Sequence, residues 1–133
     1  MIRWFERHNK LSWTITIFGA VMIFYLSSIT FDFLAIVKGG PNLISTLYHL
    51  LAFFCFTFFL LISSTKGRIN YSLFALTIVI AIFYGLLDEV HQLFVAGRFF
   101  AFSDIFLDTT GALFAFMIYF ISVKYRQIKV QNL

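Results

Sequence analysis

The 133-residue sequence contains little charge. Only 12% of its residues are Asp, Glu, Lys or Arg, whereas 61% are hydrophobic, and the mean hydropathy is +0.92. A soluble domain of this size would carry about twice that charged fraction. The composition therefore excludes an ordinary soluble domain and predicts an integral membrane protein. The length predicts a single domain over residues 1–133.

Cysteine is almost as scarce as charge. Cys55 is the only cysteine, so an intrachain disulfide is excluded. It lies inside an apolar run, where we expect it to be a small buried hydrophobic side chain.

The net charge of +4 is not arranged as a face that binds nucleic acid, and no nucleic-acid partner is predicted. Eight of the ten basic residues precede the first apolar run, separate the second from the third, or follow the last. They are Arg3, Arg7, Lys10, Lys66, Arg68, Lys124, Arg126 and Lys129. This is the distribution that the positive-inside rule describes. It predicts a multi-pass protein of the cell membrane with both termini in the cytoplasm, leaving Lys38 and Arg98 on the outer side.

Four apolar runs predict an all-α bundle of four transmembrane helices, over about 11–31, 43–63, 71–92 and 104–123. Each is about as long as the 20 residues that a crossing needs. The first is too long for a signal peptide and lacks a small-residue cleavage site. Gly39-Gly40-Pro41 predicts a turn, and Gly97 predicts a bend in the aromatic connector 93–102. We expect Ser103 to cap the fourth helix, and the basic tail to be partly disordered.

Four of the six carboxylates fall between Tyr84 and Gly111, at the predicted outer end, together with other polar side chains. Asp88, Glu89, His91 and Gln92 end the third span, Arg98 lies in the connector, and Asp104 and Asp108 begin the fourth. Helical spacing places Asp88, His91 and Gln92 on one face, with Glu89 beside it, and aligns Asp104 with Asp108. His49 enters from the same side, about 10 Å down the second span. We expect these groups to converge at comparable depth.

These residue types predict two kinds of chemistry. Carboxylates and histidine can bind a divalent cation, which is the candidate cofactor, and Glu89, Asp88 or His91 are the candidate catalytic groups. Arg98 is suited to a bidentate grip on phosphate. We assign His49, Gln92, Arg98, Asp104 and Asp108 to substrate binding. The spacing does not fit a zinc protease, which needs two histidines at i and i+4.

Two non-enzymatic alternatives remain open. In the first, the polar groups only tie the helices of a scaffold together: Arg98 pairs with Asp88, Asp104 or Asp108, and His49 and Gln92 bond between helices. One arginine does not neutralise four carboxylates, however, so a proton, water or a cation is also required. In the second, the chain is a small dimeric transporter, but such proteins hold their carboxylate near the bilayer midplane.

The ordered polar motif resembles the VanZ-like family of small membrane proteins. The resemblance rests on three groups of residues: Phe24-Tyr25-Leu26-Ser27-Ser28; His49; and the series Tyr84 to Gln92, Gly97-Arg98, Ser103-Asp104, Asp108 and Gly111. Thr46, Ala96 and Asp108 stand where that family often has Lys, Pro and Asn. The resemblance implies a membrane-embedded helical fold with its site at the outer surface. It also implies a link to glycopeptide (teicoplanin) resistance.

Taken together, the residues and the resemblance predict a protein that works among membrane lipids. We expect it to bind or modify an anionic lipid headgroup or a cell-envelope precursor at the outer leaflet. The residues do not indicate an oligomeric state.

Overall fold

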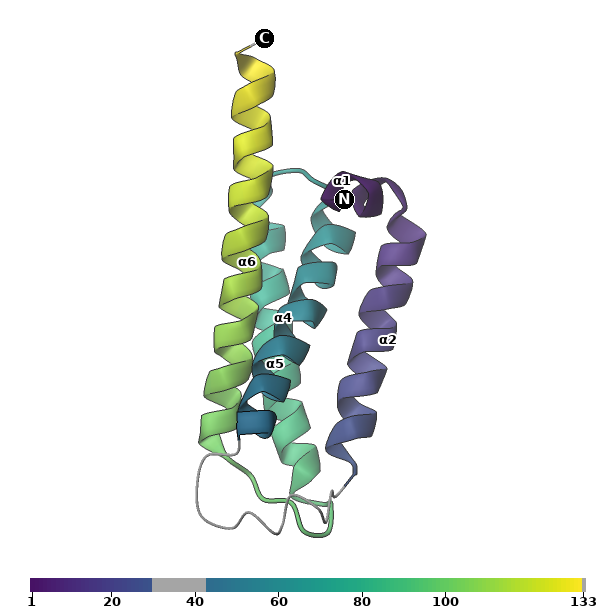
Figure 1. The fold of residues 1–133 in the computed structure, drawn as a ribbon, viewed down its shortest axis with the longest axis vertical. Coiled ribbons are helices and arrows are strands. Elements are labelled where there is room, and N and C mark those ends of the chain that lie inside the picture. Colours follow the sequence, from purple (N-terminus) through teal and green to yellow (C-terminus); the bar gives the residue numbers. More distant parts are fainter. Residues whose placement is uncertain (30–42, 133) are drawn as a thin grey trace.

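The computed structural model describes residues 1–29 and 43–132, which form a bundle of long helices (Figure 1). Four helices are long and apolar enough to cross a membrane: α2 (Asn9–Ser27), α4 (Leu43–Thr65), α5 (Tyr71–Gln92) and α6 (Phe102–Gln131). The short helix α1 (Ile2–Arg7) lies at the end of the bundle that also holds the N-terminus, and α6 extends beyond that end. No strand occurs among the described residues. The predicted all-α, four-span architecture is therefore confirmed.

The ends of the elements differ from the prediction in three places. The first span is α2, and the residues before it form the separate helix α1. The fourth span begins at Phe102 with Ala101 as its N-cap, and the Ser103 hydroxyl bonds Asp104 instead of capping the helix. The basic tail is helical to Gln131, because residues 124–131 contain neither Gly nor Pro. The far end of the expected first span, Lys38 and the expected turn Gly39-Gly40-Pro41 lie outside the described residues.

Helix α4 is the centre of the bundle, since it packs against α2, α5 and α6, most extensively against α6. Gly111 permits this close approach, because a Cβ atom there would collide with the Leu50 carbonyl oxygen of α4. Small residues at helix interfaces allow such contact in membranes, where van der Waals packing drives association. The closely packed pair α4 and α6 therefore carries His49 and Asp108.

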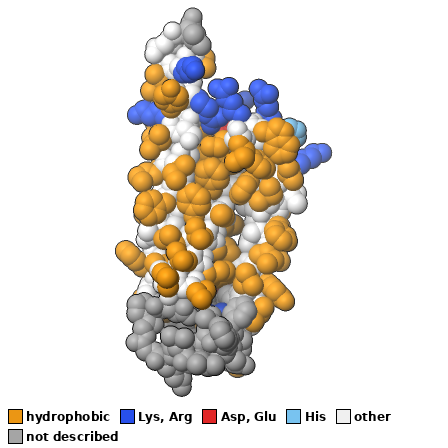
Figure 2. All heavy atoms as spheres, in the orientation of Figure 1, with side chains coloured by type: hydrophobic (Ala, Val, Ile, Leu, Met, Phe, Trp, Pro, Cys, Tyr) orange, Lys and Arg blue, Asp and Glu red, His pale blue; other side chains and the backbone are white. Residues whose placement is uncertain are grey.

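The surface of the spans is apolar (Figure 2). Large hydrophobic side chains are exposed along every span, whereas the blue Lys and Arg side chains gather at the end where α1 lies. An exposed apolar surface of this extent is what a lipid-facing bundle presents. The structure thus separates a basic end from an apolar middle.

At the basic end, a network of polar contacts joins the first helix to the last. Glu6 accepts two bonds from the Arg126 guanidinium, at 2.6 and 2.7 Å, and a third from the Tyr119 hydroxyl at 3.1 Å. The buried Tyr119 hydroxyl also accepts from the Gly67 amide and lies 2.9 Å from the Thr65 hydroxyl. This network fixes α1 and the α4–α5 loop against α6.

A hollow of about 200 Å³ lies between α2 and α4, lined almost entirely by apolar side chains. Gly19, Met22, Ala52 and Cys55 are among its lining residues. Cys55 is exposed, so the expectation of a buried thiol is wrong. The residue lies on an apolar helix, but at the hollow beside α2, where its side chain stays open.

Candidate functional site

The end of the bundle opposite α1 holds a buried polar site to which α2, α4, α5, α6 and the connector all contribute. His49 of α4 is only 2% exposed, and its Nδ1 lies 2.9 Å from Asp108 Oδ1 of α6. Its other ring nitrogen, Nε2, lies 3.5 Å from Asp104 Oδ2, one helical turn earlier on α6. The i, i+4 spacing of the two aspartates places both on the face that meets α4. His49 is therefore held between two carboxylates.

Glu89 enters the site from α5 and is fully buried. Its Oε2 accepts a bond of 2.8 Å from the amide of Ala101, and its Oε1 accepts one of 3.2 Å from the Gln92 amide. The Gln92 amide also donates to Asp88 Oδ2 at 3.0 Å. Glu89 thus attaches the start of α6 to α5. Among the described residues Gln92 bonds within its own helix, and not between helices as the scaffold alternative expects.

Asp88 ties α5 to α2. Its Oδ1 accepts a bond of 2.6 Å from the Ser27 hydroxyl, and with the Gln92 bond both carboxylate oxygens have partners. His91 lies on the same side but is half-buried: its Nε2 is 2.9 Å from the Ser28 hydroxyl, and its ring stacks on Phe24 with the centroids 4.2 Å apart. Among the described residues, His91 thus contacts the C-terminal end of α2, away from the His49 group.

Arg98 does not form the predicted pair with a carboxylate among the described residues. Its Nη2 donates to the carbonyl oxygens of Ile29 and Leu26, at 2.9 and 3.4 Å. Both carbonyls lie at the C-terminal end of α2, where the helix dipole is negative and a cation is favourable, and the Leu26 oxygen also accepts from the Ile29 amide. The Nε atom of Arg98 is buried and has no hydrogen-bond partner in the part of the chain that the structure describes. Gly97, with φ +80°, makes the bend that turns the connector there, as predicted.

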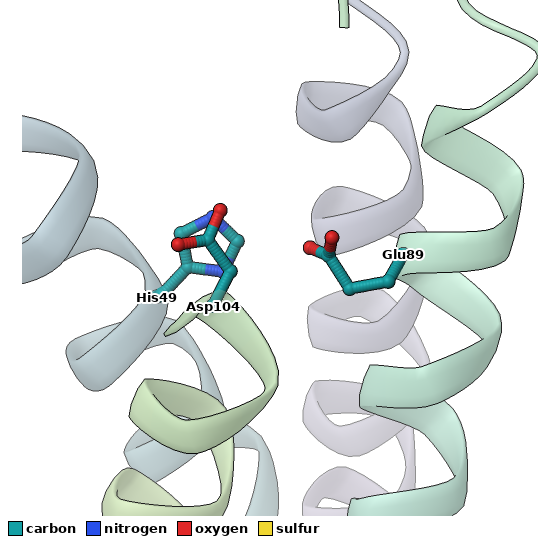
Figure 3. Close-up of side chains that lie close together, drawn as sticks. All are labelled: His49, Glu89 and Asp104. Carbon is teal, nitrogen blue, oxygen red and sulfur yellow. The ribbon is translucent and has the colours of Figure 1, made fainter. Parts of the chain in front are cut away.

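Three of the predicted residues are arranged so that they could hold a metal ion. Figure 3 shows Glu89 reaching from α5 towards His49 and Asp104, and one ligand atom from each of the three lies within 4.8 Å of the other two. Asp108 contacts the other side of the His49 ring, and its second oxygen is buried with no partner among the described residues. Asp88, His91, Gln92 and Arg98 lie outside this trio. The structure thus divides the predicted residues into a trio, a supporting aspartate, three residues that contact the end of α2, and Gln92, which bonds within α5.

Sequence reasoning placed Ser27 and Ser28 in the first span but not in the site. Their hydroxyls bond Asp88 and His91, across 61 and 63 positions of the chain. The sequence did hold one indication of their role, because both serines belong to the Phe24–Ser28 segment on which the family resemblance partly rests. The Ala101 amide was also missed, because residue type says nothing of a backbone donor.

Among the families of known proteins, the model described as VanZ/LLP1 matches residues 4–123, nearly the whole chain. The chain belongs to the VanZ/LLP1 family. Neither the curated proteins nor the solved structures contain a match. In this VanZ-family protein, the residues that carried the resemblance are largely those that meet at the polar end of the bundle.

Proposed function

We propose that this VanZ-family protein resides in the cell membrane with both termini in the cytoplasm. The support is the charge distribution, because Lys and Arg gather at the end of the bundle where α1 lies (Figure 2). Cytoplasmic loops and tails carry such an excess. The polar site at the opposite end then faces the outer leaflet.

We infer that this site binds the phosphate of an anionic lipid headgroup or of a lipid-linked cell-envelope precursor. The observation that carries the proposal is the state of Arg98: it bonds backbone carbonyls, and its buried Nε has no partner within residues 1–29 and 43–132. A guanidinium keeps its charge and offers five donors, so donors remain for a bidentate grip on phosphate. A link to teicoplanin resistance belongs to this proposal, through the envelope precursor.

The carboxylates around the site oppose the binding of an anion there unless their charge is offset. Asp88, Glu89 and Asp108 are each 3% exposed or less, and Asp104 is partly exposed. An anion entering here meets their field, so their charge has to be offset by protons or by a cation. A phosphate held by both Arg98 and a bound cation satisfies that condition.

The scaffold is the second candidate, and Asp88 favours it. Both of its oxygens are bonded, one to α2 and one within α5, as a purely structural tie requires. A scaffold has no preference for an anionic headgroup, which separates it from the proposed function. The grouping of the acids at one end does not favour a transporter with a midplane carboxylate.

The test is headgroup binding by Arg98 variants. Purified protein in micelles is titrated with phosphatidylglycerol, phosphatidylcholine and a polyprenyl diphosphate, and bound lipid is counted by native mass spectrometry. We expect the wild type to prefer a phosphate-rich lipid, and the two anionic probes to separate a headgroup from a precursor. Arg98→Lys keeps the charge but loses the planar fork, so binding should weaken by about tenfold or more, an effect of at least about 1.4 kcal/mol. Thin-layer chromatography of the same lipids after incubation detects turnover.

Arg68→Lys is the matched control, since Arg68 is exposed and lies at the basic end. It should bind lipid as the wild type does. If Arg98→Lys matches the wild type in both melting temperature and lipid binding, the phosphate grip is wrong. If the wild type binds phosphatidylcholine as well as either anionic lipid, the scaffold stands instead.

A further inference from the structure

We propose that His49, Glu89 and Asp104 form a divalent-cation site, with His49 coordinating through Nε2 and Asp108 positioning its ring. The proposal extends the function proposed above, because the cation would offset the acids and offer a coordination position to a phosphate oxygen. Its test uses no anionic lipid, so the two proposals can fail separately.

The ligand atoms of the three side chains lie nearly close enough together to share one metal ion. One atom from each side chain lies within 4.8 Å of the other two, and each comes from a different helix (Figure 3). Metal–ligand distances of about 2.0–2.3 Å place two ligands of one ion roughly 3–4.6 Å apart. The trio therefore needs only small side-chain movements to close on an ion.

The position of the hydrogen on the His49 ring supports the site independently of the number of acids around it. An ionised Asp108 can only accept a hydrogen, so the 2.9 Å contact places that hydrogen on Nδ1. The Nε2 atom then presents a lone pair towards Asp104 Oδ2, 3.5 Å away, a contact that is not a hydrogen bond. The His49 side chain is only 2% exposed, so solvent does not separate these two electron-rich atoms. They repel each other unless a cation or a proton lies between them.

The carboxylate behind the histidine is a familiar part of metal sites. Ligating histidines commonly donate their second ring N–H to a carboxylate, which fixes the tautomer and orients the ring. Asp108 has this position on His49, and it is only 1% exposed, with its second oxygen unpartnered. The arrangement Asp108–His49–cation thus explains a buried carboxylate whose one bond to a described residue is to His49.

The ligand types indicate the class of metal. One imidazole nitrogen and two carboxylates suit Mn²⁺, Fe²⁺ or Zn²⁺ better than Mg²⁺ or Ca²⁺, which prefer oxygen ligands alone. Asp104 is 23% exposed, so the site opens to one side. Three protein ligands leave at least one coordination position for water or phosphate.

The experiment measures metal binding by chelator-treated, detergent-purified protein. Mn²⁺ binding is followed by loss of the free-ion electron paramagnetic resonance signal, with Zn²⁺ and Mg²⁺ as competitors and the melting temperature as a second readout. We expect one Mn²⁺ per chain, displaced by Zn²⁺ but poorly by Mg²⁺. Glu89→Gln and Asp104→Asn should each weaken binding by about tenfold or more, and Asp108→Asn by about 10–100-fold, as removal of a supporting carboxylate does.

His91→Gln is the control, because His91 is the nearby histidine whose contacts are with α2. It should bind Mn²⁺ as the wild type does, which excludes binding at His91. Metal-free melting temperatures establish that each variant is folded, and Asp104→Asn, at a partly exposed position, is the variant most tolerant of change. If the folded wild type binds no Mn²⁺ or Zn²⁺, or if folded Asp104→Asn binds as the wild type does, the proposal is overturned and a protonated His49 accounts for the contacts.

Discussion

Single side chains at the polar end of the bundle act as ties between helices. The Ser27 hydroxyl donates to Asp88 Oδ1 across only 2.6 Å, and the carboxylate that receives it is 3% exposed. Water does not replace a lost partner at such a position, so the cost of removing one is the cost of an unsatisfied buried oxygen. The neighbouring pair of Ser28 and His91 is exposed to solvent, which can replace the bond.

We predict that Ser27→Ala lowers the free energy of unfolding by about 1–2 kcal/mol. The matched variant Ser28→Ala should cost less than about 0.5 kcal/mol, because its bond is solvent-accessible. Reversible unfolding in mixed micelles of increasing dodecyl sulfate content measures both. Equal losses for the two serines would show that burial of the Asp88 carboxylate does not set the strength of this tie.

Part of the site could be predicted at this scale, and part could not. The i, i+4 spacing of Asp104 and Asp108 was enough to put both on one face, and the depth of His49 was enough to place it beside them. The partners of Arg98 were out of reach, because they are backbone carbonyls of α2 that no residue type marks. The same holds for the bond from the Ala101 amide to Glu89.

Among the helices, the contact between α4 and α6 determines whether the site can form. Gly111 lies one turn after Asp108, and the Leu50 carbonyl that it faces belongs to the residue after His49. The two backbones approach closely at the level of the His49–Asp108 bond. Any side chain at position 111 would separate the helices at that level.

We predict that Gly111→Ala destabilises the protein by about 1–3 kcal/mol, as overpacking does, and weakens Mn²⁺ binding at His49. Gly19→Ala is the control, since a Cβ atom at Gly19 of α2 meets nothing within 4 Å. It should leave stability unchanged or raise it by up to about 1 kcal/mol, because alanine is the better helix former. Unfolding of both variants in detergent checks this, and a neutral Gly111→Ala would contradict the close approach.

The spans themselves followed from the apolar runs, because a bilayer leaves the chain little choice but helix over such lengths. The ends did not follow, since they depend on local chemistry. Asn70 caps α5 through a bond from the Leu73 amide, whereas α6 begins at Phe102 without a side-chain cap. Helix α6 continues to Gln131 because the tail contains good helix formers. The basic charge of the tail had suggested partial disorder instead.

At the scale of the whole molecule, the two ends of the bundle differ in chemistry. The end near α1 presents basic side chains with Glu6 engaged by Arg126, and the other encloses carboxylates and histidine. This asymmetry predicts one orientation in the membrane.

We predict that, in a Cys55→Ala background, Ala96→Cys is labelled by a membrane-impermeant maleimide added to intact cells, and Lys66→Cys is spared. Both positions are exposed, and they lie at opposite ends of the bundle. Labelling of Lys66→Cys after the cells are permeabilised is the control for reactivity. The reverse pattern in intact cells would place the termini outside and the polar site in the cytoplasm.

The exposed Cys55 in the hollow between α2 and α4 gives the protein a native attachment point for a spectroscopic probe. It is the only thiol in the chain, so a nitroxide or fluorophore coupled there needs no substitution elsewhere. A label at this point senses the spacing of α2 from the centre of the bundle. The otherwise unaltered sequence can therefore report whether α2 shifts as Mn²⁺ or a lipid headgroup binds at the polar end of the bundle.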